Sequence, residues 1–128
     1  MMRHAAVFLL VLCGLSWSSW ARQGEVPKEP PREPRVFREV AVGEGPKLRY
    51  ALVTPRGWKE GQAAPTLVAF PPGAQNESMV EMGLSMYWEA EAVQRGWVVA
   101  SPMSREGKVL MQDEPALLAL LDDLAKLG

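Results

Sequence analysis

The sequence predicts an α/β fold, a partial doubly wound sheet in which a β-hairpin is followed by a strand, a helix, a second strand and a second helix. Two segments alternate apolar and polar residues, two short segments are apolar throughout, and a helical repeat of apolar residues follows each of the latter. Strands that alternate with helices are typical of a sheet with parallel crossovers. The chain has 128 residues, 48% of them hydrophobic and 23% charged, which is the composition of one globular domain.

The first 21 residues have the layout of a secretory signal peptide. Basic Arg3 precedes an apolar run over residues 5–15, and Ser19 and Ala21 supply the small side chains of a cleavage site after Ala21. We therefore predict export, with a secreted or periplasmic product. The alternative is a short membrane anchor, which the apolar run disfavours because it is shorter than the ~20 residues that span a bilayer.

The single His and the single Cys, His4 and Cys13, both fall inside this predicted signal peptide. Leu12 is bulky where a lipoprotein signal needs a small residue, so we expect a freely exported chain without a stable membrane span. After cleavage the chain lacks the side chains for a His/Cys zinc site, a Cys nucleophile, a disulfide or a Ser-His-Asp triad. We expect no metal and no cofactor. The 14 Lys and Arg residues nearly balance the 15 acidic residues, so no nucleic-acid partner is expected.

Residues 22–34 form a predicted linker. From Gln23 this segment reads QGEVPKEPPREP, in which prolines alternate with charges and few apolar groups are available for burial. Such a composition favours an extended polyproline-type conformation. We interpret it as a spacer between the signal peptide and a domain of residues 35–128, and a ligand for a proline-recognition module is the alternative.

Residues 35–42 (RVFREVAV) and 47–54 (KLRYALVT) alternate apolar and polar side chains on either side of a GEGP turn, which predicts the hairpin. A polar turn region follows over residues 55–65. Residues 66–70 (TLVAF) are apolar in almost every position, which predicts a short strand buried on both faces, as in a parallel sheet.

The first helix is predicted from Ser78 to Arg95. Ser78 and Glu81 have the S-x-x-E spacing of a capping box, and Gly96 can end the helix in a left-handed conformation. Side chains at helical spacing predict the buried face of this helix, namely Val80, Gly83, Tyr87, Ala90 and Val93. Three methionines on the same helix are interpreted as core residues, namely Met79, Met82 and Met86.

The second half of the pattern repeats the first. Residues 97–101 (WVVAS) predict a strand that stops at Pro102, and Asp113 can cap a helix over residues 115–127. Leucines at helical spacing predict the face that lies on the sheet, namely Leu117, Leu120, Leu121, Leu124 and Leu127. The adjacent acids Asp122 and Asp123 are interpreted as part of a solvated face. A sheet of these elements would leave an edge strand and some of the leucines with little to cover them.

The element order, with the segments TLVAFPPGAQNES and WVVASPMS at residues 66–78 and 97–104, resembles the N-terminal half of an α/β-hydrolase. The resemblance is to the secreted esterase and polyhydroxybutyrate-depolymerase-like branch, and it covers residues 35–128. It implies a strand that ends in a His-Gly-x-Gly-like loop, whose backbone N–H supplies part of an oxyanion hole. It also implies a nucleophile elbow, G-x-S-x-G, on a later strand.

The resemblance places Gly73 and Ala74 at the positions of the oxyanion-hole donors, and Gln75 at that of a polar, substrate-binding residue. A proline stands where the family has His, and Ala74 stands where it has Gly. The donor role survives these departures because it needs a correctly aimed backbone N–H rather than a particular side chain. The alternative is a plain turn in which Gly73 provides only backbone freedom.

Two segments look like a nucleophile elbow, and neither qualifies. GLSWS at residues 14–18 lies in the predicted signal peptide, and GLSMY at residues 83–87 lies within the predicted helix and ends in Tyr. Ser85 is therefore interpreted as a helix-surface or packing residue. We expect the N-terminal portion of an exported serine esterase, inactive alone, whose full-length form hydrolyses a small-molecule or polymeric ester. The alternative is a small, exported, non-catalytic binding domain.

Overall fold

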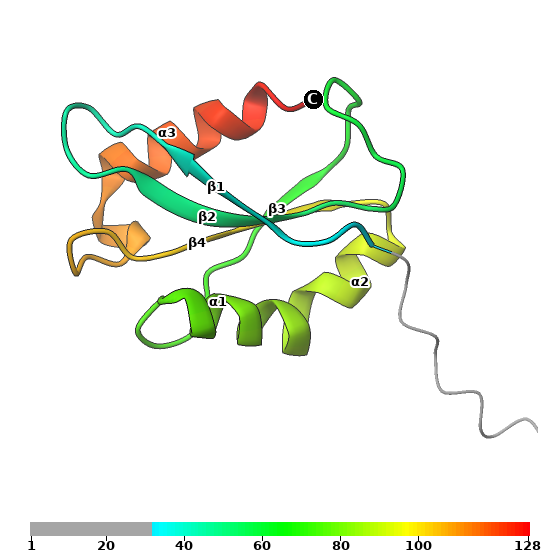
Figure 1. Cartoon of the computed structure of the whole chain (residues 1–128), viewed down its shortest axis with the longest axis horizontal. Coiled ribbons are helices and arrows are strands. Elements are labelled where there is room, and N and C mark those ends of the chain that lie inside the picture. The colour runs from blue at the N-terminus through cyan, green and yellow to red at the C-terminus, as the bar shows by residue number, and fades with distance from the viewer. Residues whose placement is uncertain (1–31) are drawn as a thin grey trace, which may run out of the picture.

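The protein is described by a computed structural model over residues 32–128, so the predicted signal peptide and most of the predicted linker lie outside the described residues. Figure 1 shows the arrangement of strands and helices in this range. In chain order the elements are β1 (Val36–Val40), β2 (Leu48–Val53), β3 (Thr66–Val68), α1 (Glu77–Gly83), the π-helical turn η1 (Leu84–Trp88), α2 (Glu89–Gln94), β4 (Val98–Pro102), the 3-10 turn η2 (Leu110–Gln112) and α3 (Glu114–Ala125).

The four strands form one mixed sheet in the order β1-β2-β4-β3. β1 and β2 are the antiparallel hairpin, with Val36 opposite Leu52, and β2 is also antiparallel to β4. β3 runs parallel to β4, with Leu67 opposite Val99. The prediction of an α/β fold with a hairpin followed by β-α-β-α is therefore confirmed for these residues.

Helices cover both faces of the sheet, with α3 on one face and the continuous run α1-η1-α2 on the other (Figure 1). Each face has its own hydrophobic core. The core under α3 consists mainly of Leu48, Tyr50, Leu52, Val98, Ala100, Leu110, Ala116, Leu120 and Leu127. The core under α1, η1 and α2 consists of Ala51, Val53, Ala69, Val80, Leu84, Ala92, Val93, Val99 and Met103. Alternate residues of β2 and β4 enter opposite cores, which is why most residues of these central strands are apolar on both faces.

β3 is less buried than the sequence predicts. Its parallel pairing with β4 is confirmed, but Thr66 is exposed and Leu67 and Val68 are only half-buried. The physical reason is its place at the end of the strand order, where no described strand covers its outer side. An apolar run indicates that a strand can be buried. Whether it is buried depends on whether other strands lie on both of its sides.

The first helix begins earlier than the capping-box pattern predicts. The N-cap is Asn76, whose side-chain oxygen accepts a hydrogen bond from the N–H of Met79 at 3.0 Å, and the helix starts at Glu77. Ser78 lies in the first turn, so the predicted N-cap at Ser78 is wrong by two residues. Asn is as good an N-cap as Ser, and the two candidates stand close together in the sequence.

A π-helical turn in the middle of this helix corrects the predicted buried face. Leu84–Trp88 forms η1, which holds one residue more than an α-turn and so rotates the following residues by about 100°. Tyr87 is therefore 60% exposed, although the regular spacing placed it in the core. The buried residues after the turn are Glu89, Ala92 and Val93, so the prediction is confirmed for Val93 and wrong for Ala90, which is exposed. Met82 and Met86 are 40% and 63% exposed, so the interpretation of these two methionines as core residues is also wrong.

Glu89, directly after the π-helical turn, is a buried acid held by two arginines. Its two carboxylate oxygens lie 2.5 Å from Nε of Arg32 and 2.6 Å from Nε of Arg35. Nη2 of Arg35 also donates a hydrogen bond to the hydroxyl of Ser85 at 2.6 Å. This cluster, the Glu89 clamp, joins the chain before β1 to the helix run. The contacts begin at Arg32, three residues before the predicted domain boundary.

A part-buried polar contact joins β2 to α3. The hydroxyl of Tyr50, a residue with no exposed surface, donates to Oδ2 of Asp123 at 2.6 Å. Burial and this hydrogen bond raise the pKa of Tyr50, so the phenol stays protonated. Asp123 is therefore not simply part of a solvated face, since it is half-buried and its carboxylate accepts this hydrogen bond.

Candidate functional site

The candidate site is the loop of residues 69–76, which connects β3 to α1 at the carboxyl end of β3. The first residue of the loop is still bonded to the sheet, because the N–H of Ala69 donates to the carbonyl of Ala100 in β4 at 2.8 Å. Two of its residues have left-handed backbone conformations, Gly73 with φ +66° and Gln75 with φ +50°. Such a conformation is ordinary for Gly and uncommon for Gln, so Gln75 must be held by its surroundings.

Residues at the end of β4 hold the carbonyl groups of this loop. The hydroxyl of Ser101 donates to the carbonyl of Ala69 at 2.8 Å, and this contact is buried. Just beyond β4, the hydroxyl of Ser104 donates to the carbonyl of Ala74 at 3.3 Å, and the N–H of Ser104 donates to the carbonyl of Gln75 at 2.9 Å. Both strands thus contribute to one fixed loop at their shared carboxyl edge.

The backbone N–H groups of Gly73 and Ala74 are available to a ligand. Both residues are exposed, and no hydrogen bond joins either N–H to another group within residues 32–128. The side chain of Met79 lies beside Gly73, where a Cβ would stand 3.5 Å from its terminal carbon, an ordinary contact distance. The constraint to Gly at this position is therefore the left-handed backbone and not lack of space.

Gln75 lies beside these two residues in the sequence, but its side chain turns inward. It is 6% exposed, and its Oε1 accepts a hydrogen bond from the N–H of Leu110 at 3.4 Å. Leu110 begins the turn η2 that precedes α3. The three residues that the resemblance singles out are therefore adjacent, with two exposed backbone donors and one buried side chain that ties the loop to η2.

The segment between β4 and α3 is fixed by an ion pair between Arg105 and Asp113. The guanidinium of Arg105 donates to both carboxylate oxygens of Asp113, at 3.0 and 2.9 Å, and to the carbonyl of Pro46 in the hairpin turn at 3.0 Å. Asp113 stands at the N-cap position of α3, as predicted, but its side chain makes no capping hydrogen bond. The hydrogen bonds from Arg105 hold the pKa of Asp113 below its ordinary value.

Because of the Arg105–Asp113 ion pair, we expect the stability of the folded chain to depend on pH. The pKa of Asp113 is lower in the folded chain than in the unfolded chain, where Asp titrates near ~4. Its stabilising contribution is therefore present above about pH 4 and is lost as the pH falls through the folded pKa. Thermal unfolding should show Asp113→Asn melting below the native chain at pH 7, with the difference shrinking toward pH 2. The exposed Asp122→Asn serves as control, and a difference that is constant with pH would contradict the assignment.

Ser85 does not have the surroundings of a nucleophile. Its hydroxyl accepts a hydrogen bond from Arg35, a cation that cannot accept its proton, and it lies on a helical turn rather than at the end of a strand. The only His in the sequence is His4, which lies outside the described residues. The interpretation of Ser85 as a helix-surface residue agrees with this placement.

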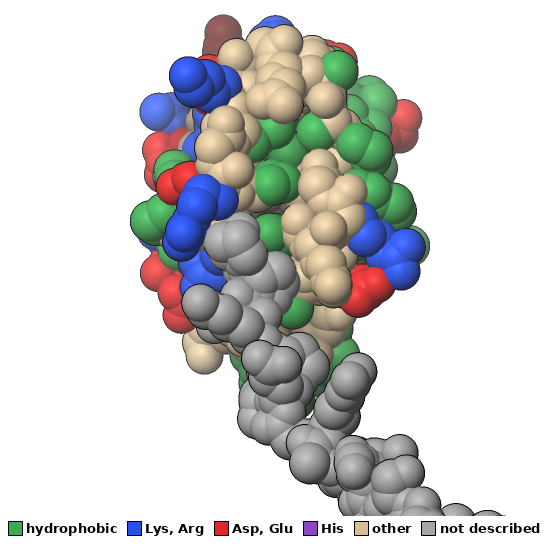
Figure 2. Space-filling model, turned by 90° about the vertical axis from the view of Figure 1, so that its right-hand side faces the viewer, with side chains coloured by type: hydrophobic (Ala, Val, Ile, Leu, Met, Phe, Trp, Pro, Cys, Tyr) green, Lys and Arg blue, Asp and Glu red, His purple; other side chains and the backbone are tan. Residues whose placement is uncertain are grey.

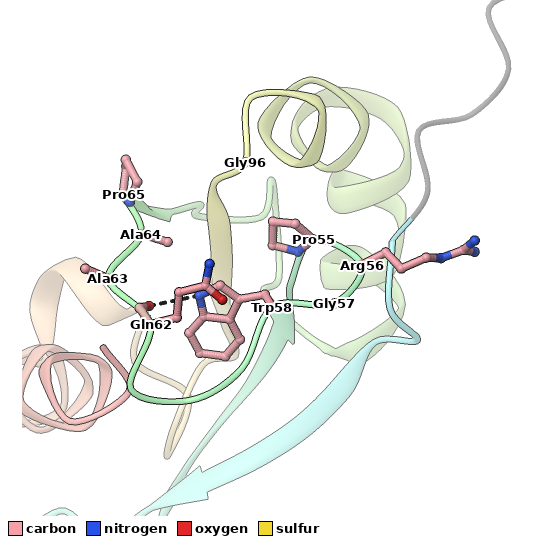
Figure 3. A pocket seen from close by; sticks show the side chains of 9 residues that line it. All are labelled: Pro55, Arg56, Gly57, Trp58, Gln62, Ala63, Ala64, Pro65 and Gly96. Carbon is pink, nitrogen blue, oxygen red and sulfur yellow. Dashed lines mark hydrogen bonds between the residues drawn. The ribbon is translucent and has the colours of Figure 1, made fainter.

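A separate hollow of about 220 Å³ lies beside Trp58, at the opposite end of the sheet from the loop of residues 69–76. Figure 3 shows the indole of Trp58 between Pro55 and Gln62, with its Nε1 donating to the carbonyl of Gln62 at 3.0 Å. Figure 2 looks at this end, where hydrophobic side chains lie in the middle of the face and charged side chains lie around them. The hollow is at the amino end of β3, away from the Gly73 and Ala74 donors.

Neither a metal cluster nor a membrane-spanning helix is found in the part of the chain that the structure describes. In residues 32–128 no group of three or more His, Cys, Asp and Glu side chains is arranged to hold a metal ion. In the same range no helix combines the length and the apolar character that crossing a bilayer requires.

Comparison of the chain with protein-family models, curated proteins and solved structures finds no match.

Proposed function

We propose that this chain supplies one half of the oxyanion hole of an exported serine esterase of the α/β-hydrolase type. The backbone N–H of Gly73 or Ala74 donates a hydrogen bond to the oxygen that becomes negative when a Ser nucleophile attacks an ester carbonyl. The observation that carries the proposal is the pair of exposed N–H groups without a partner in residues 32–128. They lie in a loop whose carbonyls are held by Ser101 and Ser104.

The position of the loop supports this role. Ligands of open α/β sheets bind beyond the carboxyl ends of the strands, and the loop lies there, between β3 and α1. The left-handed backbone of Gly73 supports it as well, because left-handed residues occur in the loops whose successive N–H groups form a cradle for an anion. Gln75 contributes to substrate binding by fixing this cradle through its contact with Leu110.

The nucleophile, the general base and its acid come from residues outside 32–128. Ser85 is bonded to Arg35, and the single His of the sequence, His4, belongs to the predicted signal peptide. A Ser nucleophile needs a neighbouring base to accept its proton. The coding sequence beyond codon 128 is the direct test: a strand followed by G-x-S-x-G, then an acid and a His, is expected there. A stop codon at once, with no such partner chain in the same transcript, would contradict the proposal.

The kinetic test joins the 128 residues to the segment that carries the nucleophile. We expect the purified 128-residue chain to release no p-nitrophenol from p-nitrophenyl butyrate, and the completed enzyme to do so. In the completed enzyme Ala74→Pro, which removes one donor N–H, should lower kcat by about 10²-fold or more. Ala63→Pro makes the same change in an exposed loop at the other end of the sheet and should leave kcat unchanged. Turnover by the 128 residues alone would refute the placement of the nucleophile elsewhere.

A non-catalytic exported binding domain is the second candidate function. The observation that favours it is the exposed apolar surface on the outer side of the first helix, where Met82, Met86 and Tyr87 are 40%, 63% and 60% exposed. Apolar side chains gathered on a surface are typical of interaction sites. If this candidate is correct, the purified chain unfolds cooperatively, its NMR spectrum is sharp, and joining it to any downstream segment yields no esterase activity.

A further inference from the structure

Ser104, just beyond the end of β4, holds two successive carbonyl groups of the loop of residues 69–76. Its hydroxyl donates to the carbonyl of Ala74 at 3.3 Å, and its N–H donates to the carbonyl of Gln75 at 2.9 Å. Two adjacent peptide groups of the loop are therefore bonded to one residue, which limits rotation of the backbone at Ala74. The direction of the exposed N–H groups in the loop thus depends on the position of Ser104.

Arg105, the next residue, is anchored to two other segments of the chain. Its side chain is 11% exposed, and its guanidinium donates to both carboxylate oxygens of Asp113, at 3.0 and 2.9 Å. It also donates to the carbonyl of Pro46 in the hairpin turn at 3.0 Å. A planar guanidinium that binds both oxygens of a carboxylate has a fixed orientation. Arg105 therefore ties the backbone beside Ser104 to the hairpin turn and to the start of α3.

Uncommon backbone conformations lie on both sides of this anchor. In residues 32–128 the left-handed residues other than glycine are Gln75, with φ +50°, and Glu106, with φ +53°. The carbonyl of Gln75 accepts the N–H of Ser104, and Glu106 directly follows Arg105. Side chains of this kind stay in the left-handed region only where surrounding contacts hold them there. This indicates that Ser104 and Arg105 hold the backbone around them.

The charged groups around Arg105 leave Asp113 as its main partner. The Arg105 and Asp113 side chains are 11% and 5% exposed, so water screens their attraction only weakly. Glu106 lies 3.7 Å from Nη1 of Arg105, but its side chain is 50% exposed and its attraction is screened. Lys108 adds a weaker attraction for the carboxylate of Asp113. The orientation of the guanidinium is therefore set by Asp113 and by the carbonyl of Pro46.

We propose that Arg105 is a positioning residue for the loop of residues 69–76. Arg105 fixes Ser104, and Ser104 fixes the backbone that carries the N–H groups of Gly73 and Ala74. The inference deepens the proposed function and rests on it in one respect, since these N–H groups are the donors that the esterase reaction would use. The contacts themselves need no reaction, so the conformational effect is measurable in the chain alone.

Lysine at position 105 separates the shape of the side chain from its charge. An ammonium group keeps the attraction to Asp113, but it is a single point of contact and lacks the planar fork of a guanidinium. It cannot bind both carboxylate oxygens in parallel and also reach the carbonyl of Pro46 as Arg105 does. Arg105→Lys therefore loosens the anchor without leaving an unpaired carboxylate.

Amide hydrogen exchange of the purified 128-residue chain tests the positioning. In Arg105→Lys we expect exchange to accelerate by about tenfold or more at Ser104 and Leu110, whose N–H groups donate to Gln75. The acceleration should be smaller at Val99, which lies in the central strand β4 and opens with the sheet. Equal acceleration at Ser104 and Val99 would mean that the variant lowers only the global stability, and would overturn the inference.

Amide chemical shifts report the backbone of the loop directly. The resonances of Gly73 and Ala74 should move in Arg105→Lys, because their backbone is then held less firmly. Arg95→Lys is the matched control. Arg95 also donates two hydrogen bonds to a carboxylate, that of Glu91, but both side chains are about 60% exposed at the end of α2. This control should leave the resonances of Gly73 and Ala74 unchanged.

Gly45→Ala tests the same connection from the hairpin turn. A Cβ at Gly45 would stand 3.2 Å from Nη1 of Arg105, so the guanidinium has to move. The resonances of Gly73 and Ala74 should therefore shift in Gly45→Ala, and they should not shift in Glu44→Ala, which changes the exposed neighbouring residue. Constant resonances of Gly73 and Ala74 in both Arg105→Lys and Gly45→Ala would refute the positioning role.

Kinetics of the completed enzyme separate this inference from the proposed function. Arg105→Lys should lower kcat about tenfold and change KM by less than about twofold, because the donors contact the oxygen most strongly when it is negative. Displaced resonances of Gly73 and Ala74, with no esterase activity in any completed form, would support the positioning and refute the proposed function. Esterase activity with unmoved resonances would refute the positioning and support the proposed function.

Discussion

Replacing Glu89 with glutamine is expected to lower the free energy of unfolding by about 3 kcal/mol, because Arg32 and Arg35 lose the buried negative charge with which they pair. The side chain of Glu89 is 4% exposed, while those of Arg32 and Arg35 are 30% and 17% exposed. Removing one member of a buried ion pair leaves its partners desolvated and uncompensated. Partial exposure allows water to reach the arginines, which places the expected loss at the lower end of the usual range.

Urea unfolding measures this loss, and Glu91→Gln is the matched control. Glu91 lies two residues farther along α2 and pairs with Arg95 on the surface, where both side chains are about 60% exposed. An exposed pair one helical turn apart contributes ~0.5 kcal/mol or less. The denaturation midpoint should fall strongly for Glu89→Gln and barely for Glu91→Gln. Equal midpoints for the two variants would mean that the Glu89 clamp contributes no more than a surface ion pair.

Leu120→Ala is expected to have a comparable effect, a loss of about 3 kcal/mol. Leu120 has no exposed surface and lies in the core between α3 and the sheet. Truncation removes buried methyl groups and leaves a cavity that the rigid sheet on one side cannot close. The helical backbone itself tolerates Ala well, so the loss measures packing and not helix propensity.

Leu118→Ala on the same helix is the matched control, because it shortens a leucine that is not packed in the core. Leu118 is 54% exposed, and its truncation should change stability by less than about 1 kcal/mol. Calorimetric unfolding of both variants compares them directly. If Leu118→Ala melts as low as Leu120→Ala, then α3 does not hold the sheet through the buried face described above.

The elements with regular periodicity could be predicted from the sequence, and the irregular one could not. Alternation in the hairpin and apolar runs around Leu67 and Val99 specify strands and their faces, and the structure contains both. The π-helical turn at Leu84–Trp88 has no such marker. It inserts one residue into the helical repeat, so the predicted buried face is right at Val80 and Gly83, wrong at Tyr87 and Ala90, and right again at Val93. This shift explains the exposure of Tyr87, whereas Met82 is exposed before the turn begins.

The candidate loop was found through Gly73 and Ala74, but the residues that hold it were missed. Ser101 and Ser104 follow the apolar run of β4, and the carboxyl ends of neighbouring parallel strands lie at the same edge of a sheet. That rule could have placed these serines beside the loop. The inward turn of Gln75 could not have been predicted, because it depends on a left-handed backbone and on a partner, Leu110, that lies 35 residues away.

The two edges of the sheet differ in how readily they accept a further strand. Fibres form when each subunit has two edges that accept strands, because every addition then exposes a fresh one. Here the β1 edge carries the Arg38–Glu60 and Lys47–Glu39 pairs, and β3 does not. A strand added beside β3 would leave the charged β1 edge as a free edge of the sheet. The charges on β1 thus protect the sheet against growth from that side, even where the other edge is open.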